Sequence, residues 1–267
     1  MIIDCHVHCG ELDNSAPQTY EDIAPRLDEA GVDGAVCFSP VMEIYDRFDP
    51  DFQDNKYWQK RREHSREYLC SLRNRTNHRI YPFHFVWNDF DTSNLERYCG
   101  IKWHRHANEP EYNYDSPECA GMLDAIREQG FVILLEETYG NTLRLVDGIG
   151  KGIPFIIPHL GYLNGGIRRL LNEDFWKREN TYADMSSETS SAAEIKEFID
   201  RYGPHRLLYG SDYPFSTSLA RKKVIEELNL PAADEELIFS GNIMRLLKNV
   251  RQAKPKVSTN DKVIPRT

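Results

Sequence analysis

The sequence lacks the features that mark membrane proteins, nucleic-acid-binding proteins and cysteine-based metal or redox sites. No apolar run approaches the ~18 residues of a membrane-spanning helix. Asp and Glu outnumber Lys and Arg by 42 to 33, and the net charge of −9 argues against a broad phosphate-binding surface. The six cysteines show neither metal nor redox spacing. We therefore expect a cytoplasmic protein with a small-molecule substrate and with no nucleic-acid or membrane partner, and we leave assembly as a homodimer open.

We also expect no signal peptide, because the N-terminal stretch is acidic and candidate ligands begin at residue 4. Positive charge is concentrated in one run, Lys60-Arg61-Arg62, which is followed by Arg66, Arg73 and Arg75. Such a run is typical of a solvated helix face, and this is the role that we predict for it.

The length and the order of apolar runs predict a barrel. A chain of 267 residues is close to the ~250 typical of a (β/α)8 barrel. Eight strand-like runs alternate with amphipathic stretches, which indicates a parallel sheet covered by helices. The runs are Met1–Val7, Gly34–Phe38, Ile80–Val86, Gly100–Trp103, Phe131–Leu135, Pro154–Pro158, Thr181–Asp184 and Leu207–Tyr209. We predict an α/β fold, a distorted TIM (β/α)8 barrel.

The alternative fold is a doubly wound open sheet, which requires a Gly-rich turn after the first strand. The stretch His8-Cys9-Gly10-Glu11 is not such a turn. The amphipathic stretches between the strands predict helices, and the clearest of them are Tyr20–Ala30, Met122–Gln129, Ala192–Tyr202 and Ser218–Leu228.

The barrel is predicted to span residues 1–251 as a single domain, followed by a polar C-terminal tail at 252–267. An insertion at about 39–77 follows the second strand and therefore leaves the C-terminal face of the barrel, where sites lie. It carries five aromatic residues between positions 45 and 58. They indicate either a lid or wall of a substrate pocket, or an insertion that serves packing or oligomerisation.

The stretch Asp4-Cys5-His6-Val7-His8 carries the strongest chemical signal. Alternate side chains share one face of a strand, so His6 and His8 are placed to bind one metal ion. The spacing alone is a weak signal, since His104 and His106 repeat it. The signal becomes stronger because later apolar runs also end in residues that can bind a metal, namely Glu136, His159 and Asp212.

These residues also have ordinary structural interpretations. His6 and His8 could be hydrogen-bonded core histidines, and Asp212 could cap a helix. His159 could pack beneath a glycine turn.

Six short stretches, spread in order along nearly the whole chain, together match the pattern of a known family. They are Ile2-Ile3-Asp4-Cys5-His6-Val7-His8, Gly100-Ile101-Lys102-Trp103-His104, Pro158-His159-Leu160-Gly161, Tyr182-Ala183-Asp184-Met185-Ser186, Leu207-Leu208-Tyr209-Gly210-Ser211-Asp212-Tyr213-Pro214 and Gly241-Asn242-Ile243-Met244-Arg245-Leu246-Leu247. This set resembles the amidohydrolase superfamily. It is most similar to the amidohydrolase-related branch that includes aminocarboxymuconate-semialdehyde decarboxylase-like proteins. The resemblance implies a barrel of the metal-dependent hydrolase type, with ligands from the first, fifth and eighth strands.

The fifth strand departs from the family pattern, which usually has a His ligand after an apolar run. Here Val132-Ile133-Leu134-Leu135 is followed by two glutamates. Counting from Gly130 places Glu136 at the His position, whereas counting back from Thr138 places Glu137 there. We prefer Glu136. A carboxylate still binds zinc, manganese or iron, but it makes the donor set harder.

The resemblance and the residues together predict a metal-dependent hydrolase. One divalent ion, zinc with manganese or iron as alternatives, is expected at His6, His8, Glu136 and Asp212. Asp212 is also the predicted general base, and His159 is predicted to stabilise the water or the developing oxyanion. The expected substrate is a small anionic amide, ester or lactone.

Lys102, His104, Trp58 and Tyr112 are the predicted substrate-binding residues. Three roles stay open for Lys102: it binds a substrate carboxylate, forms a salt bridge with Glu136, or is carbamylated to bridge two metals. Two other functions are alternatives to hydrolysis. One is a metal-dependent, non-oxidative decarboxylase that uses the same residues, and the other is a non-catalytic metal-binding barrel.

Overall fold

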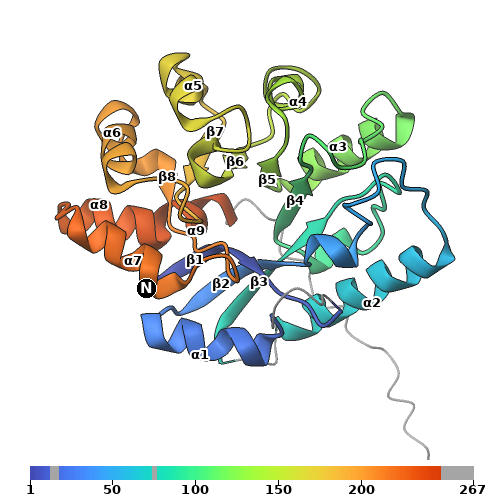
Figure 1. The fold of residues 1–267 in the computed structure, drawn as a ribbon, viewed down its shortest axis with the longest axis horizontal. Helices are drawn as coiled ribbons and strands as arrows, with labels where there is room; N and C mark the ends of the chain where they lie inside the picture. The colour runs from blue at the N-terminus through green and yellow to red at the C-terminus, as the bar shows by residue number, and fades with distance from the viewer. Residues whose placement is uncertain (13–17, 74–76, 248–267) are drawn as a thin grey trace, which may run out of the picture.

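The chain forms a parallel eight-stranded barrel surrounded by helices (Figure 1). The structure is a computed structural model, and it describes residues 1–12, 18–73 and 77–247. The strands are β1 Ile3–His8, β2 Gly34–Phe38, β3 Arg79–Phe85, β4 Gly100–His104, β5 Ile133–Glu136, β6 Phe155–Ile157, β7 Thr181–Asp184 and β8 Leu207–Leu208. Each strand pairs with the next one in the sequence, and all seven pairings are parallel.

Hydrogen bonds between β1 and the chain after β8 bring the two edges of the sheet together. The Cys5 amide donates to the Tyr209 carbonyl at 3.0 Å, and the Asp212 amide donates to the His6 carbonyl at 2.8 Å. The sheet therefore forms a nearly closed barrel, and the predicted distorted TIM (β/α)8 barrel is confirmed. The strand order lacks the reversal that a doubly wound sheet requires, so that alternative is wrong.

Helices surround the barrel (Figure 1). They are α1 Tyr20–Ala30, α2 Lys56–Leu72, α3 Pro117–Gln129, α4 Tyr139–Leu143, α5 Ile167–Asn172, α6 Ala192–Tyr202, α7 Ser218–Glu227, α8 Ala232–Glu236 and α9 Asn242–Leu247. Helices α1 to α6 lie between strands, and α7 to α9 follow β8. Local sequence sets the ends of α1: Thr19 and Asp22 form a capping box, and Gly31 ends the helix in the left-handed conformation with φ of 65°. Among the described helices, none is both long and apolar enough to cross a membrane.

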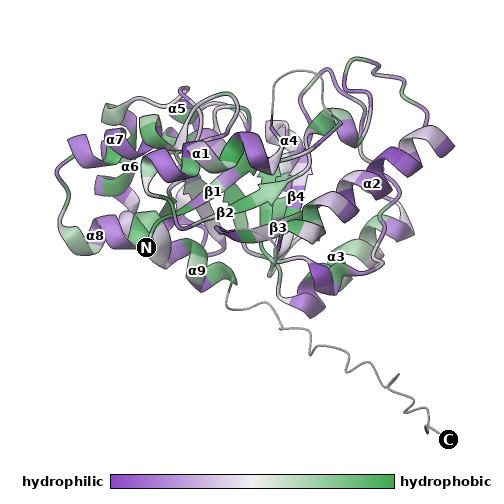
Figure 2. Cartoon of the chain, turned by 90° about the horizontal axis from the view of Figure 1, so that it is seen from below, coloured by the Kyte–Doolittle hydropathy of each residue, from purple (hydrophilic) through white to green (hydrophobic). Residues whose placement is uncertain are grey.

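Two buried apolar layers alternate along the strands. Ala35 and Cys37 of β2 belong to the layer shared with the helices, whereas Val36 and Phe38 belong to a second, smaller cluster. That smaller cluster takes one residue or more from most strands and is completed by three residues of α9, namely Ile243, Leu246 and Leu247. The apolar strands and the more polar outer helices are visible in Figure 2. Strands that are apolar on both faces explain the near-continuous apolar runs of the sequence.

The predicted insertion is described over residues 39–73 and at residue 77, and its main element is α2. The prediction that its basic run is a solvated face is wrong for Arg62, which is fully buried. The Arg62 guanidinium pairs with Asp54 at 2.5 Å and with Asp89 at 3.0 Å, and it donates to the Ile44 carbonyl at 3.0 Å. One cation thus fastens α2 both to its own preceding loop and to the loop after β3.

The predicted tail, 252–267, lies outside the described residues. The limits of the predicted single domain at 1–251 stay a prediction.

Replacement of Arg62 by Met tests whether this cation holds the insertion in place. Met retains much of the side-chain volume but leaves Asp54, Asp89 and the Ile44 carbonyl without their donor. We expect the free energy of unfolding to fall by about 3 kcal/mol, as is typical when one partner of a buried ion pair is removed. Urea denaturation measures the change. Lys60→Met, at an exposed position of the same helix, is the control, and equal stability of the two variants would contradict the role of Arg62.

Candidate functional site

Polar side chains meet at the C-terminal ends of the barrel strands. In parallel barrels these ends lie at one mouth, where catalytic residues are found. The buried polar residues at or shortly after strand ends include His6 and His8 of β1, Lys102 and His104 of β4, Glu136 of β5, His159 after β6, Asp184 of β7 and Asp212 after β8. The strand ends named by the sequence analysis therefore form one cluster.

Asp212 approaches both His6 and His8 closely enough to share a metal ion with each of them. Asp212 Oδ1 lies 3.3 Å from His6 Nε2 and 3.2 Å from His8 Nε2. Ligand atoms at about 2.1 Å from a tetrahedral ion lie about 3.4 Å apart, so each of these two spacings is that of a pair of ligands on one ion. His6, His159 and Asp212 also each offer a ligand atom within 4.8 Å of the others. The donor set present here therefore fits the metal that the family pattern implies.

Asp184 fixes the orientation of His6. Its Oδ2 accepts a hydrogen bond from His6 Nδ1 at 2.9 Å, and both side chains are fully buried. With the proton on Nδ1, the free electron pair of Nε2 points toward Asp212. A carboxylate that holds the far nitrogen of an imidazole is the usual second partner of a metal-binding histidine. Burial would raise the pKa of Asp184, but the hydrogen bonds from His6 and Ser186, together with the charges of His6 and His159, hold it well below its usual range.

Asp184 also supports His159. Its Oδ1 accepts hydrogen bonds from the His159 amide and the Ser186 amide, both at 3.0 Å. His159 Nδ1 lies 3.1 Å from the Ser186 carbonyl, which accepts its proton. His159 Nε2 then faces Glu136 Oε2 at 3.7 Å and Asp212 Oδ2 at 3.9 Å.

The backbone is left-handed at both predicted catalytic residues, with φ of 55° at His159 and 65° at Asp212. This conformation is costly for residues other than glycine, and it clusters at functional sites. Asp4 supports the turn that carries Asp212, because the Asp4 carboxylate accepts hydrogen bonds from the Ser211 amide at 2.9 Å and from the Ser218 hydroxyl at 2.6 Å. Asp4 thus belongs to the support of Asp212.

Lys102 forms the salt bridge with Glu136, which is one of the three roles that the sequence left open. Its Nζ lies 3.1 Å from Glu136 Oε2 and 3.5 Å from His6 Nε2, and the side chain is fully buried. It also lies over the Phe38 ring, 4.5 Å from the centroid. The ammonium thus stands between Glu136 and the His6 side of the cluster. A substrate contact of Lys102 stays a prediction.

The two glutamates of β5 have different surroundings. Glu136 pairs with His104 in the register between β4 and β5, and its carboxylate faces the cluster. The Glu137 carboxylate instead accepts from Arg105 at 3.1 Å and from Asn141 at 2.7 Å. The assignment of Glu136 as a ligand of the ion at His6 stays a prediction.

Charges within the cluster shift the pKa values of its members. Burial would raise the pKa of Glu136, but the neighbouring His104 and Lys102 hold it well below its usual range. Burial would likewise raise the pKa of Asp212, and the histidines around it lower it instead. For His159, burial is outweighed by the nearby carboxylates of Glu136, Asp212 and Asp184, which raise its pKa to about 9. The carboxylates are therefore ionised at neutral pH.

The remaining predicted substrate residues lie at different distances from the cluster. His104 belongs to it, with Nε2 at 3.1 Å from Glu136 Oε1. Tyr112 is buried, and its hydroxyl lies 2.8 Å from the Val86 carbonyl and 3.2 Å from the His104 carbonyl, beside the end of β4. Trp58 packs edge-on against Phe52 in the insertion. Substrate contacts of these three residues stay predictions.

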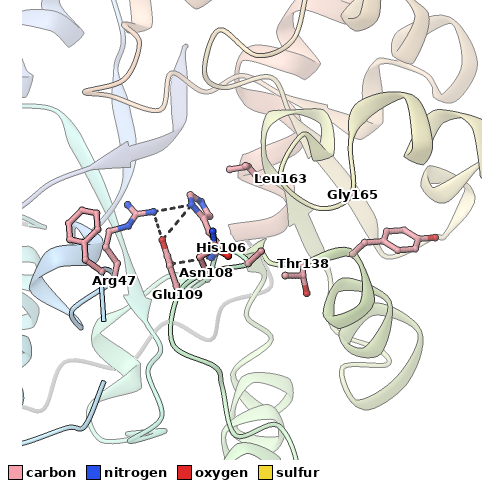
Figure 3. A pocket seen from close by; sticks show the side chains of 10 residues that line it. Arg47, His106, Asn108, Glu109, Thr138, Leu163 and Gly165 are labelled. Atoms are coloured by element: carbon pink, nitrogen blue, oxygen red, sulfur yellow. Dashed lines mark hydrogen bonds and ion pairs between the residues drawn. The ribbon is translucent and has the colours of Figure 1, made fainter. Parts of the chain in front are cut away.

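A cavity of about 680 Å³ opens beside the cluster (Figure 3). Its lining comes from the insertion and from the loops after β4, β5 and β6. The residues are Arg47, Phe48, His106, Ala107, Asn108, Glu109, Thr138, Tyr139, Leu163 and Gly165. His106 links the cavity to the cluster, because its Nε2 lies 2.6 Å from Glu136 Oε1. The presence of Arg47 and Phe48 in the lining supports the prediction that the insertion forms a pocket wall.

Sequence reasoning missed the roles of Asp184, Ser186 and Asp4. Asp184 could have been predicted from the sequence, since it ends a predicted strand as other site residues do and lies within a stretch that resembles the family. The contacts of Ser186 and Asp4 depend on how the strands meet across the barrel, and the sequence gives no sign of them.

Comparison with known proteins supports this fold and identifies the family. The sequence model of the family described as Amidohydrolase matches residues 3–248. No curated protein matches the sequence.

Several solved structures are similar over nearly their whole length. The 2,6-dihydroxybenzoate decarboxylase from Rhizobium has a TM-score of 0.69 at 14% identity, covering 92% of this chain and 98% of that one. The probable 2-pyrone-4,6-dicarboxylic acid hydrolase from Acinetobacter baumannii, with citric acid bound, has a TM-score of 0.62 at 15% identity, covering 92% and 99%. A dihydroxybenzoic acid decarboxylase from a Polaromonas species, with bound manganese and an inhibitor, has a TM-score of 0.65 at 14% identity, covering 92% and 96%.

At these identities the solved structures establish the fold alone, and they include both a hydrolase and decarboxylases. The family model covers nearly all of the chain. The protein therefore belongs to the amidohydrolase family.

Proposed function

We propose that the protein is a metal-dependent hydrolase that acts on a small anionic ester, lactone or amide. The observation that carries the proposal is the position of Asp212. One oxygen of its carboxylate lies within 3.3 Å of both His6 Nε2 and His8 Nε2, and the other faces His159. A single carboxylate can therefore help to hold a metal ion and still exchange a proton with a bound water.

In this proposal His6, His8 and Asp212 hold one divalent ion, and zinc or manganese suits such nitrogen and oxygen donors. When bound, the ion lowers the pKa of a coordinated water to about 7. Glu136 is the predicted fourth ligand. Its approach to the same ion requires the Lys102 ammonium to move, because that group lies between Glu136 and His6.

Asp212 acts as the general base and takes the proton of the attacking water, and it later returns the proton to the leaving group. His159 acts on the substrate oxygen. The Ser186 carbonyl holds its Nδ1 proton, so Nε2 is the atom that faces the reacting centre. A proton on Nε2 donates to the oxygen on which negative charge develops.

The cavity beside the cluster limits the substrate to a small molecule. Phe48, Tyr139 and Leu163 provide apolar surface, while Arg47 and His106 provide positive charge or hydrogen-bond donors. This combination suits a compact carbon skeleton that carries a carboxylate. The charged wall comes from the insertion and the loop after β4.

A decarboxylase is the second candidate, because the similar solved structures include decarboxylases of dihydroxybenzoates. The same metal and the same residues would serve, with a proton delivered to a substrate carbon in place of hydrolysis. The two reactions differ in their products, so they can be separated directly.

An assay panel of carboxylated lactones, esters, amides and hydroxybenzoates tests the proposed function. The protein is loaded with zinc or manganese, and acid release and carbon dioxide are followed in parallel. We expect hydrolysis of at least one carboxylated ester, lactone or amide without release of carbon dioxide. Release of carbon dioxide alone would replace the hydrolase with the decarboxylase. Inactivity toward the whole panel, with metal bound, would favour a non-catalytic barrel.

Asp212→Asn tests the role of the general base. Asn keeps the shape of the side chain and one oxygen that can reach the ion, but it cannot accept the proton. We expect a retained fold, at least partial metal binding and a fall in turnover of ~10²-fold or more. Asp200→Asn, an exposed carboxylate on α6, is the control. Normal turnover of Asp212→Asn would move the role of base to His159.

Asp184→Asn tests the support of His6. The amide has nearly the same shape but no charge, so it holds the His6 Nδ1 proton less firmly. We expect the affinity for zinc to fall by about 10–100-fold, which is the typical effect of losing such a partner. Competition with a chromophoric chelator gives the affinity, and the melting temperature reports on folding. An unchanged affinity would show that the orientation of His6 does not depend on Asp184.

A further inference from the structure

A second cluster of potential metal ligands lies beside the first. His104 Nε2 and His106 Nε2 both face Glu136 Oε1, at 3.1 Å and 2.6 Å. These three residues each offer a ligand atom within 4.8 Å of the others. We propose that His104, His106 and Glu136 form a second divalent-metal site, separate from the ion at His6, His8 and Asp212.

The His104 nitrogen that points away from Glu136, Nδ1, has oxygen neighbours that can accept its proton. The Tyr45 hydroxyl donates its one proton to Glu109 Oε2 at 2.7 Å. His104 Nδ1 lies 3.3 Å from the Tyr45 oxygen and 3.6 Å from Glu109 Oε2. In the tautomer that has its proton on Nδ1, this proton points to these oxygens, and Nε2 carries a free electron pair. Nε2 faces Glu136 Oε1 at 3.1 Å, so both atoms can bind the same metal ion.

Glu109 serves His106 in a similar way. His106 Nδ1 lies 3.4 Å from Glu109 Oε1 and 3.0 Å from Arg47 Nη2, and Arg47 itself pairs with Glu109. While Arg47 donates to Nδ1, the proton of His106 sits on Nε2 and is shared with Glu136. When an ion binds Nε2, this proton moves to Nδ1, where Glu109 accepts it. The buried Glu109 carboxylate thus lies beside the far nitrogens of both histidines, at 3.6 Å from that of His104 and 3.4 Å from that of His106, where carboxylate partners lie in metal sites.

Two imidazole nitrogens and one carboxylate oxygen form a donor set for zinc, manganese, iron or cobalt. Lys102 occupies the other oxygen of Glu136, so Oε1 is the oxygen that is free for the second site. His106 and Glu109 also line the cavity of about 680 Å³, on the wall drawn in Figure 3. Open coordination positions of a second ion would therefore face the cavity and accept an oxygen donor of the substrate, such as a carboxylate. This ion is additional to the single ion that the sequence predicts.

Metal content tests the proposal directly. The full-length protein is stripped with a chelator, reloaded with Zn²⁺, desalted and measured by elemental analysis. We expect about two zinc ions per chain, and about one in His106→Asn and in His104→Asn, because each variant loses one of only three ligands. His64→Asn is the control, since His64 is an exposed histidine that also contacts a carboxylate, that of Glu11 at 2.9 Å, and it should keep both ions.

The His8→Asn variant distinguishes the first site from the second, since it should lose the ion of the first site and keep about one zinc ion per chain. A variant with both His8→Asn and His106→Asn should bind essentially no zinc. Wild-type content of about one zinc ion that is unchanged in His104→Asn and His106→Asn would overturn the second site and leave the proposed hydrolase site intact. Loss of one ion in His106→Asn together with an unchanged melting temperature supports it. The wild-type stoichiometry decides the matter if a variant fails to fold.

Discussion

The buried carboxylate of Asp184 is the constraint on which the candidate site depends. It accepts hydrogen bonds from the ring of His6, from the backbone of His159 and from Ser186, and it lies fully inside the protein. A buried charge is costly unless it is fully bonded, so the surrounding donors cannot turn away without exposing it. One residue of β7 thereby sets the direction of an imidazole on β1 and the backbone of the turn after β6. The side chains that would bind the ion and move the proton are held before any substrate arrives, as efficient catalysis requires.

Glu136 links this site to the rest of the mouth. One of its oxygens faces Lys102 and the other faces the two histidines of the loop after β4. A histidine at this position would remove the carboxylate that pairs with Lys102 at 3.1 Å, so Glu136 and Lys102 balance one another's charge. The same carboxylate extends the polar cluster toward the cavity, where Arg47 and Glu109 continue it.

Much of the fold could be predicted because it rests on local and periodic signals. The predicted bounds of Gly34–Phe38 and Ala192–Tyr202 are confirmed without change, since apolar runs and helix caps are written in adjacent residues. The sequence also predicted that the site residues lie together, because all parallel strands of a barrel end at the same mouth. Pairings across the barrel could not be predicted in this way. The burial of Arg62 depends on carboxylates from two different loops, and the contact between Asp184 and His6 joins residues 178 positions apart.

The central claim is that the first strand and the residue after the eighth bind a catalytic metal ion. Anomalous diffraction from crystals of the protein loaded with zinc or manganese tests it most directly. The account predicts a strong anomalous peak within about 2.0–2.2 Å of His6 Nε2, His8 Nε2 and an oxygen of Asp212. A well-ordered barrel mouth with no anomalous peak at these three atoms, at saturating metal, would contradict it.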